Sequence, residues 1–159
     1  MTPCDLIATA RRTVGTGPGA PKQSDLRRAV STTYYAVFHC LARCCADTLV
    51  GKARAYRSEP AWRQAYRALE HGHARSQCLR PVIRGFPPEI EAFADKFVAM
   101  QGKRHQADYD PHPPEGPWSK ADVEDDIDTA QDAIARFEAV PLPDRRAFAV
   151  HVLLKNRNP

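Results

Sequence analysis

Hydrophobic positions recur at three- and four-residue steps through most of the chain, which is the spacing of one face of an α-helix. Alternating patterns typical of strands are scarce. Stretches rich in Gly and Pro separate the periodic segments, because neither residue readily continues a helix. The pattern predicts an all-α protein, a bundle of five or six helices over approximately residues 5–14, 25–50, 60–79, 89–108, 119–139 and 144–155.

The segment 25–50 carries apolar residues on two faces. One stripe is made of Leu26, Val30, Thr33, Val37, Leu41, Cys44 and Thr48, and the other of Tyr34, Phe38, Ala42, Cys45 and Leu49. A helix that is apolar on two faces is either central in its bundle or part of a subunit interface. A small bundle covers one such face more easily than two, so we expect a homodimer.

The segment 89–108 changes character along a single face. Its apolar stripe of Ile90, Phe93, Phe97 and Met100 continues in register to Arg104 and Asp108. A buried or half-buried charge costs several kcal/mol unless it is paired or used. We therefore expect the Arg104 side chain to point inward or into a cleft. It either pairs with Asp108 at i, i+4 or holds a phosphate among its polar neighbours, which are Lys103, His105, Tyr109, Asp110 and His112.

Charge is divided unevenly between the two halves of the chain. Residues 1–84 hold fourteen Lys and Arg against five Asp and Glu, a net charge of +9, and residues 85–159 hold nine against fourteen, a net charge of −5. The two halves either complement each other internally or expose a basic face to a polyanion. No apolar run approaches the roughly 20 residues of a membrane span, and Met1–Arg12 lacks the features of a signal peptide. We expect a cytoplasmic protein that does not engage a membrane.

Five cysteines, an odd number, fit a disulfide framework poorly and match no zinc-binding spacing. Cys40, Cys44 and Cys45 lie within a predicted helix, where Cys is most often a small buried residue. A metal site built from these three with His39 is the alternative. His71 and His73 are two residues apart, so they point to different faces of a helix. The chain also lacks a Gly-rich phosphate loop and the motifs of Ser or Cys nucleophiles. We expect no metal and no cofactor.

Two segments together resemble HEPN-domain proteins. Residues 26–39, LRRAVSTTYYAVFH, are similar to the early helix of that family, with its Tyr-Tyr-Ala-x-Phe-His core. Residues 104–110, RHQADYD, are similar to an Arg-x-x-Ala-Asp-Tyr-Asp segment of one large bacterial branch. Ser119, Asp122, Ala130 and Phe137 are also placed as in the last long helix of that branch. The resemblance spans roughly residues 25–140.

The resemblance implies an up-and-down helical bundle at residues 24–140 that dimerises around a cleft. Residues 1–23 would then be a short helix and linker, and residues 141–159 a helical extension. Many members of the family are metal-independent endoribonucleases with an R-x4-6-H motif. Others bind RNA or nucleotides, or partner nucleotidyltransferases in toxin–antitoxin and defence systems.

Carried onto this chain, the family motif places Arg104 at the scissile phosphate but departs at the histidine. Tyr109 stands where the His is expected, His105 is adjacent to Arg104, and His112 lies one residue beyond the widest usual spacing. A phenol with a pKa near 10 moves protons poorly near neutrality. Two hypotheses follow. One is an RNA-directed protein, an endoribonuclease with Arg104, His105, Asp108, Tyr109 and His112 as catalytic candidates and Arg27, Arg28, Lys103 and Arg104 as RNA contacts. The other is a non-catalytic module for RNA, a nucleotide or a partner such as a nucleotidyltransferase or antitoxin.

Overall fold

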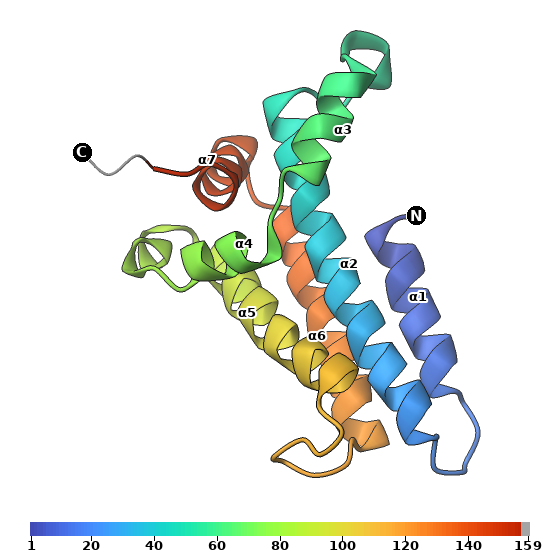
Figure 1. The fold of residues 1–159 in the computed structure, drawn as a ribbon. Coiled ribbons are helices and arrows are strands. Elements are labelled where there is room, and N and C mark those ends of the chain that lie inside the picture. Colours follow the sequence, from blue (N-terminus) through green and yellow to red (C-terminus); the bar gives the residue numbers. More distant parts are fainter. Residues whose placement is uncertain (157–159) are drawn as a thin grey trace.

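A computed structural model describes residues 1–156, and these residues form helices joined by turns and loops, without a strand (Figure 1). The all-α prediction is therefore confirmed. The seven α-helices are α1 (Pro3–Val14), α2 (Gln23–Leu49), α3 (Glu59–Arg67), α4 (His71–Cys78), α5 (Pro88–Tyr109), α6 (Lys120–Glu138) and α7 (Leu142–Leu153). Two short 3₁₀ turns, η1 (Arg54–Tyr56) and η2 (Pro81–Gly85), lie between them.

Local capping residues set most of the helix starts. Thr2 begins α1 through a capping box, in which its hydroxyl accepts from the backbone N–H of Asp5 and the Asp5 carboxylate accepts from the backbone N–H of Thr2. Ser119 caps α6 by accepting from the backbone N–H of Asp122. Proline stands in the first turn of α3, α5 and α7, where its missing N–H costs nothing. The predicted bounds thus agree to within about two residues at most ends.

The single helix expected over 60–79 is wrong, and so is the count of five or six helices. The chain leaves helical geometry at Ala68–Glu70, where Glu70 is extended with ψ of 128°. Leu69 and Ala74 are both buried, at 5% and 0% exposure. In one continuous helix these two positions would point about 140° apart, at 100° per residue. The break into α3 and α4 lets both side chains reach the core.

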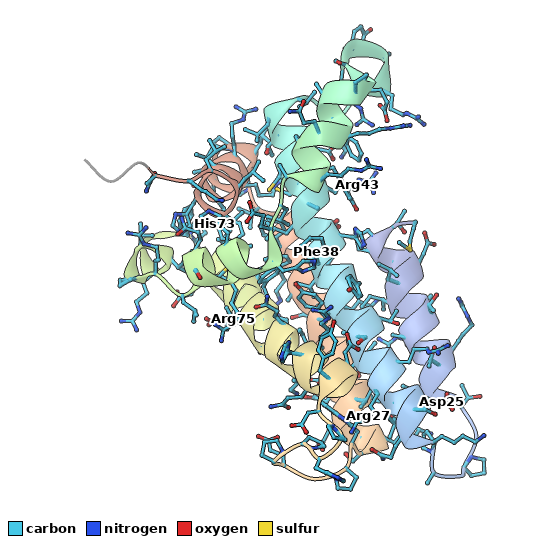
Figure 2. The ribbon with its side chains drawn as sticks, viewed as in Figure 1. Asp25, Arg27, Phe38, Arg43, His73 and Arg75 are labelled. Atoms are coloured by element: carbon cyan, nitrogen blue, oxygen red, sulfur yellow. The ribbon has the colours of Figure 1, made fainter. Side chains whose placement is uncertain are left out.

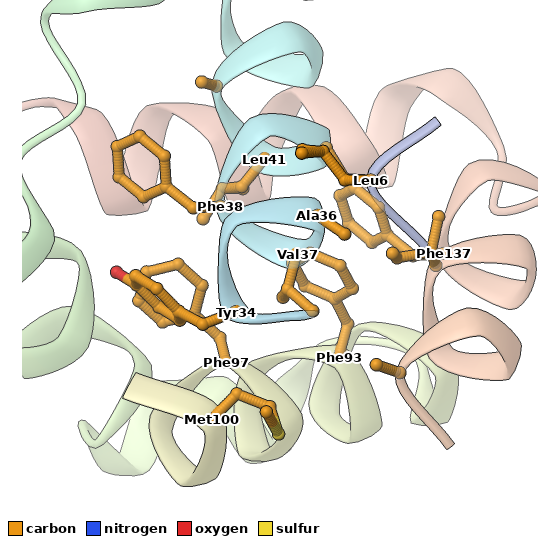
Figure 3. Packing of buried hydrophobic residues seen from close by; sticks show 14 of the residues in the cluster. Leu6, Tyr34, Ala36, Val37, Phe38, Leu41, Phe93, Phe97, Met100 and Phe137 are labelled. Atoms are coloured by element: carbon orange, nitrogen blue, oxygen red, sulfur yellow. The ribbon is translucent and has the colours of Figure 1, made fainter. Parts of the chain in front are cut away.

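Helix α2 runs through the centre of the bundle and packs against α1, α3, α5, α6 and α7. Both of its apolar stripes are buried within the single chain, with Leu49 at 42% exposure as the exception. Figure 3 shows Tyr34 and Val37 of α2 packed beside Phe93 and Phe97 of α5. The two-sided pattern is therefore explained by a central position. It no longer argues for a dimer, and the homodimer remains a prediction.

One hydrophobic core joins the whole described chain, from Leu6 in α1 to Val152 in α7. The terminal helices α1 and α7 therefore share the core of residues 24–140. In Figure 1 the C-terminal end of α2 projects beyond the rest of the bundle together with η1 and α3. The C-terminal end of α5 lies toward the opposite end of α2. This arrangement leaves α2 with one partly exposed face between α3 and the end of α5.

Candidate functional site

Arg104 lies in the last part of α5, one turn after the fully buried Met100. Its side chain is 17% exposed, so it points toward α2 as the register predicts. The guanidinium carbon lies 5.7 Å from the ring centre of Tyr34 and 5.6 Å from that of Tyr35. The Tyr109 ring, 5.8 Å away, approaches from the same helix. Three tyrosine rings therefore surround one arginine.

The polar contacts of Arg104 are few for a guanidinium with five N–H donors. Nε lies 2.9 Å from Oδ2 of Asp108, the i, i+4 pair that the spacing predicts. That N–H is not aligned with the carboxylate, and Nε has no hydrogen-bond partner among the described residues. Nη2 donates to the Tyr35 hydroxyl at 3.3 Å. Arg104 is thus held by charge and by ring contacts more than by hydrogen bonds.

Electrostatics keep Arg104 charged. Burial disfavours its cationic form, but the oxygens of Tyr35 and Asp108 outweigh burial and raise the pKa of Arg104 above its ordinary value. Burial also raises the pKa of Tyr34, although the nearby Arg104 opposes that change. The site therefore holds a fixed positive charge beside the neutral hydroxyl of Tyr34.

Asp108 is shared between two partners. Besides its ion pair with Arg104, it accepts a short hydrogen bond from the hydroxyl of Ser31 on α2. Its side chain is 30% exposed, so water also reaches it. The carboxylate therefore does not depend on Arg104 alone, which matters when the two interpretations of this arginine are compared.

The remaining catalytic candidates lie at the surface. Tyr109 is 66% exposed, and the ring of His105 lies 5.1 Å from it. His112 is exposed in the loop after α5, and its backbone N–H donates to Oδ1 of Asp110 at 2.9 Å. Tyr109 contacts Arg104, but neither His105 nor His112 shares a described hydrogen bond with it. Within one chain, the structure brings Arg104, Asp108 and Tyr109 together.

Two of the proposed RNA-binding residues have structural partners. Arg27 caps the C-terminus of α5 by donating from Nη1 to the carbonyl oxygens of Ala107 at 3.0 Å and Asp110 at 2.7 Å (Figure 2). Lys103 donates to both carboxylate oxygens of the buried Asp126, at 2.6 and 2.7 Å. Arg28 is exposed on α2 and Arg104 is partly available. The structure therefore favours the last two as contacts for a ligand.

Sequence reasoning missed His71 as a neighbour of this site. Its ring stacks on Phe38 with centres 4.0 Å apart, and Nδ1 lies 2.5 Å from the hydroxyl of Tyr34. Burial, then the charge of Arg104, lowers the pKa of His71. The break before α4 places it there. The signal for that break was the five-residue step from Leu69 to Ala74, which interrupts the helical spacing.

The cysteine trio lies in the core of the bundle. Cys40, Cys44 and Cys45 are buried and unpaired with other cysteines, and burial raises the pKa of the Cys44 thiol to about 11. Among residues 1–156, no group of three or more His, Cys, Asp and Glu is arranged to hold a metal ion. These cysteines act as small core residues, as the helical spacing indicates.

The comparisons identify no family for this chain. It matches no family model, no curated protein and no solved structure. Within the described residues, no helix is both long enough and apolar enough to cross a membrane. The resemblance to HEPN-domain proteins accordingly remains a prediction from two sequence segments.

Proposed function

We propose that this chain is a HEPN-type protein that acts on RNA and that Arg104 binds a phosphate of the RNA backbone. The observation that carries the proposal is the guanidinium of Arg104. It is largely buried, permanently charged and surrounded by rings, yet it donates one long hydrogen bond of 3.3 Å among the described residues. A cation with so few hydrogen bonds is typical of a group that binds an anion.

Phosphate fits the remaining donors of Arg104. A guanidinium presents parallel N–H groups that match two phosphate oxygens, and partial burial strengthens that attraction relative to open water. Asp108 competes for the same cation at 2.9 Å. Because Asp108 also accepts from Ser31 and reaches water, a phosphate can displace it without leaving a buried, unpaired carboxylate. The ion pair with Asp108 thus keeps the Arg104 side chain in place until an anion replaces the carboxylate.

Metal-independent cleavage would require a group that takes the proton of the 2′-hydroxyl and another that protonates the departing 5′-oxygen. His105 and His112 have the appropriate chemistry, and a second copy of the chain would have to bring one of them to Arg104. A non-catalytic RNA- or nucleotide-binding module, or a partner of a nucleotidyltransferase, is the second candidate. It is favoured by Tyr109, which is 66% exposed at the position where the family motif has its histidine.

The test measures cleavage and binding separately. Purified protein is incubated with total RNA in EDTA, which removes contaminating metal-dependent nucleases, and binding is followed by fluorescence anisotropy of labelled RNA. Arg104→Ala is compared with Arg136→Ala, which removes a similar helical Arg–Asp pair, also 2.9 Å long, on the surface of α6. We expect Arg104→Ala to weaken RNA binding at least tenfold and Arg136→Ala to leave it unchanged. Equal binding by both variants would contradict the proposal.

Cleavage decides between the two candidates. Cutting by the wild type in EDTA that disappears in Arg104→Ala supports the endoribonuclease. Binding without cutting supports the non-catalytic module. Light scattering of the same samples tests the homodimer, and a clean 17.7 kDa monomer at micromolar concentration would contradict it.

A further inference from the structure

A row of aromatic rings crosses the partly exposed face of α2, and Arg104 joins it to a last ring, that of Tyr109. The row begins on α3 with Trp62 and Tyr66, passes through His39 and Tyr35 on α2, and reaches Arg104 and Tyr109 on α5. We refer to these six residues as the aromatic row. It joins three helices that are separate in the sequence, so only the tertiary structure assembles it.

The rings of the row are closely spaced and nearly parallel. The centres of Trp62 and Tyr66 are 5.1 Å apart, those of Tyr66 and His39 are 5.8 Å apart, and those of His39 and Tyr35 are 6.1 Å apart. The angles between successive ring planes are 30°, 22° and 32°. The hydroxyl of Tyr66 also lies 2.5 Å from Nδ1 of His39, which fixes these two rings. The row is therefore a prepared surface rather than a set of mobile side chains.

The row is partly covered by the rest of the chain: the Arg57 guanidinium lies 4.3 Å from the ring centre of Trp62, and Trp62 Nε1 donates to Asp47 at 2.8 Å. Its four rings on α2 and α3 are half-buried, and Tyr109 at its end is 66% exposed. The exposed large aliphatic side chains of the described residues lie elsewhere, at Met1, at the end of α2, around η2, on α7 and just after it. The row therefore does not continue into an exposed aliphatic patch.

Several arginines lie near the row. Arg63 and Arg67 follow Trp62 and Tyr66 on α3, and Arg43 follows His39 by one turn on α2, as Figure 2 shows for Arg43 beside α3. The side chains of Arg43 and Arg63 are 49% and 68% exposed, and they lie 3.8 Å from Asp47 and 3.9 Å from Glu59. Arg28 continues the same face of α2 beyond Ser31. Partly exposed rings beside more arginines than carboxylates suit single-stranded nucleic acid.

We propose that the aromatic row is a track for single-stranded RNA, along which unpaired bases contact the rings while the flanking arginines contact phosphates, with Arg104 at one end. The inference rests on the proposed function and extends it to a substrate class and a strand path. From Ser31 to Arg43 the α2 face measures about 18 Å, at 1.5 Å per residue, which accommodates several nucleotides. A duplex is excluded from the rings because its bases are already stacked and paired.

The test compares a labelled 12-nucleotide oligouridine with the same strand annealed to its complement, by fluorescence anisotropy. We expect the wild type to bind the single strand at least tenfold more tightly than the duplex. Trp62→Leu/Tyr66→Leu should weaken single-strand binding by about tenfold or more, because stacking on aromatic side chains provides that much per base. Tyr66→Phe keeps the ring and loses only the hydroxyl contact with His39, so it should bind more tightly than the double variant does.

A second variant removes charge without touching the rings. Arg63→Gln/Arg67→Gln alters two exposed side chains on α3, a helix without buried residues, so it should fold normally. It should reduce the salt dependence of binding by about 0.7 in log–log slope for each lost phosphate contact. Arg136→Gln on α6, 67% exposed and away from the row, is the matched control and should leave the slope unchanged.

The outcomes separate the two proposals. If Arg104→Ala loses RNA binding while both α3 variants bind as the wild type does, the track is wrong and the proposed function stands. If the α3 variants lose binding and Arg104→Ala does not, the phosphate role of Arg104 is wrong and the track keeps only its α2–α3 part. If the α3 variants change the molecular mass in light scattering and leave RNA affinity unchanged, the row is a contact between copies and the track is overturned.

Discussion

Lys103 and Arg104 are neighbours in α5, yet their ion pairs are built in opposite ways. In the pair of Lys103 with Asp126 the acid is the more buried partner: the Asp126 side chain is 6% exposed and the Lys103 side chain is 38% exposed. In the pair of Arg104 with Asp108 the cation is the more buried partner: the Arg104 side chain is 17% exposed and the Asp108 side chain is 30% exposed. Lys103 satisfies both oxygens of its partner, whereas Arg104 leaves Nε without an aligned hydrogen bond among the described residues.

The difference separates a pair that stabilises the fold from a pair that keeps a cation available. A buried carboxylate whose described partner is one lysine becomes an uncompensated charge when that lysine is lost. A half-buried arginine beside an acid with a second partner can exchange that acid for another anion. Lys103 and Arg104 are therefore expected to have different roles, and variants at each position test that difference.

The largest expected loss of stability is in Lys103→Ala. It leaves the buried Asp126 carboxylate without its cation, and we expect the free energy of unfolding to fall by about 3 kcal/mol. Urea denaturation followed by circular dichroism measures the change. The double variant Lys103→Met/Asp126→Leu removes both charges and should recover most of the loss. A single variant as stable as the wild type would show that Asp126 does not need its lysine.

Arg27→Met should have the next largest effect. It removes the donors that cap the last carbonyl groups of α5, at Ala107 and Asp110, and we expect a loss of about 1–2 kcal/mol. Arg28→Met, on an exposed neighbouring position, is the matched control and should change stability by less than about 0.5 kcal/mol. Thermal unfolding of the two variants side by side makes the comparison, and equal stability would mean that the cap is dispensable.

Arg104→Ala should change stability less than Lys103→Ala and Arg27→Met do, by less than about 1 kcal/mol, because Asp108 retains Ser31 and water. Its melting temperature should be unchanged or raised, as when a functional site is relieved. RNA binding should nevertheless be lost. A variant that melts several degrees lower and still binds RNA would show instead that Arg104 is a structural partner of Asp108.

The smallest expected effect is a pH dependence centred on His71. Burial lowers its pKa in the folded protein below the ordinary value of 6.5, as it also does for His39. The unfolded chain then binds protons more readily than the folded one, so stability present above about pH 6.5 is lost as the pH falls below it. Melting temperatures measured between about pH 7.5 and 5.5 should decline, and His71→Phe should reduce the decline. An unchanged profile in that variant would remove His71 as a contributor.

Most of the fold could be predicted from the sequence because its signals are local. Helix periodicity, the Ser119 cap, and Pro and Gly breaks act within a few residues, so the approximate bounds of α1, α2, α5 and α6 followed from them. The inward direction of Arg104 followed from the same register, which left its partner open between Asp108 and a phosphate. The break between α3 and α4 was not predicted, because the gain from burying both Leu69 and Ala74 appears only once α3 packs on α2 and α4 packs on α5 and α7.

What only the tertiary structure decided is which distant residues meet. The sequence by itself placed Arg104 at the charged end of an apolar face. It left open whether α2, which is apolar on two faces, is central in its bundle or part of a subunit interface. Packing showed that one chain covers both sides, and it matched Arg27 to the end of α5 and Lys103 to Asp126. It also brought His71 into contact with Tyr34 and aligned the aromatic row across three helices. Such contacts depend on how helices are placed against one another, and helical spacing within a segment does not contain that information.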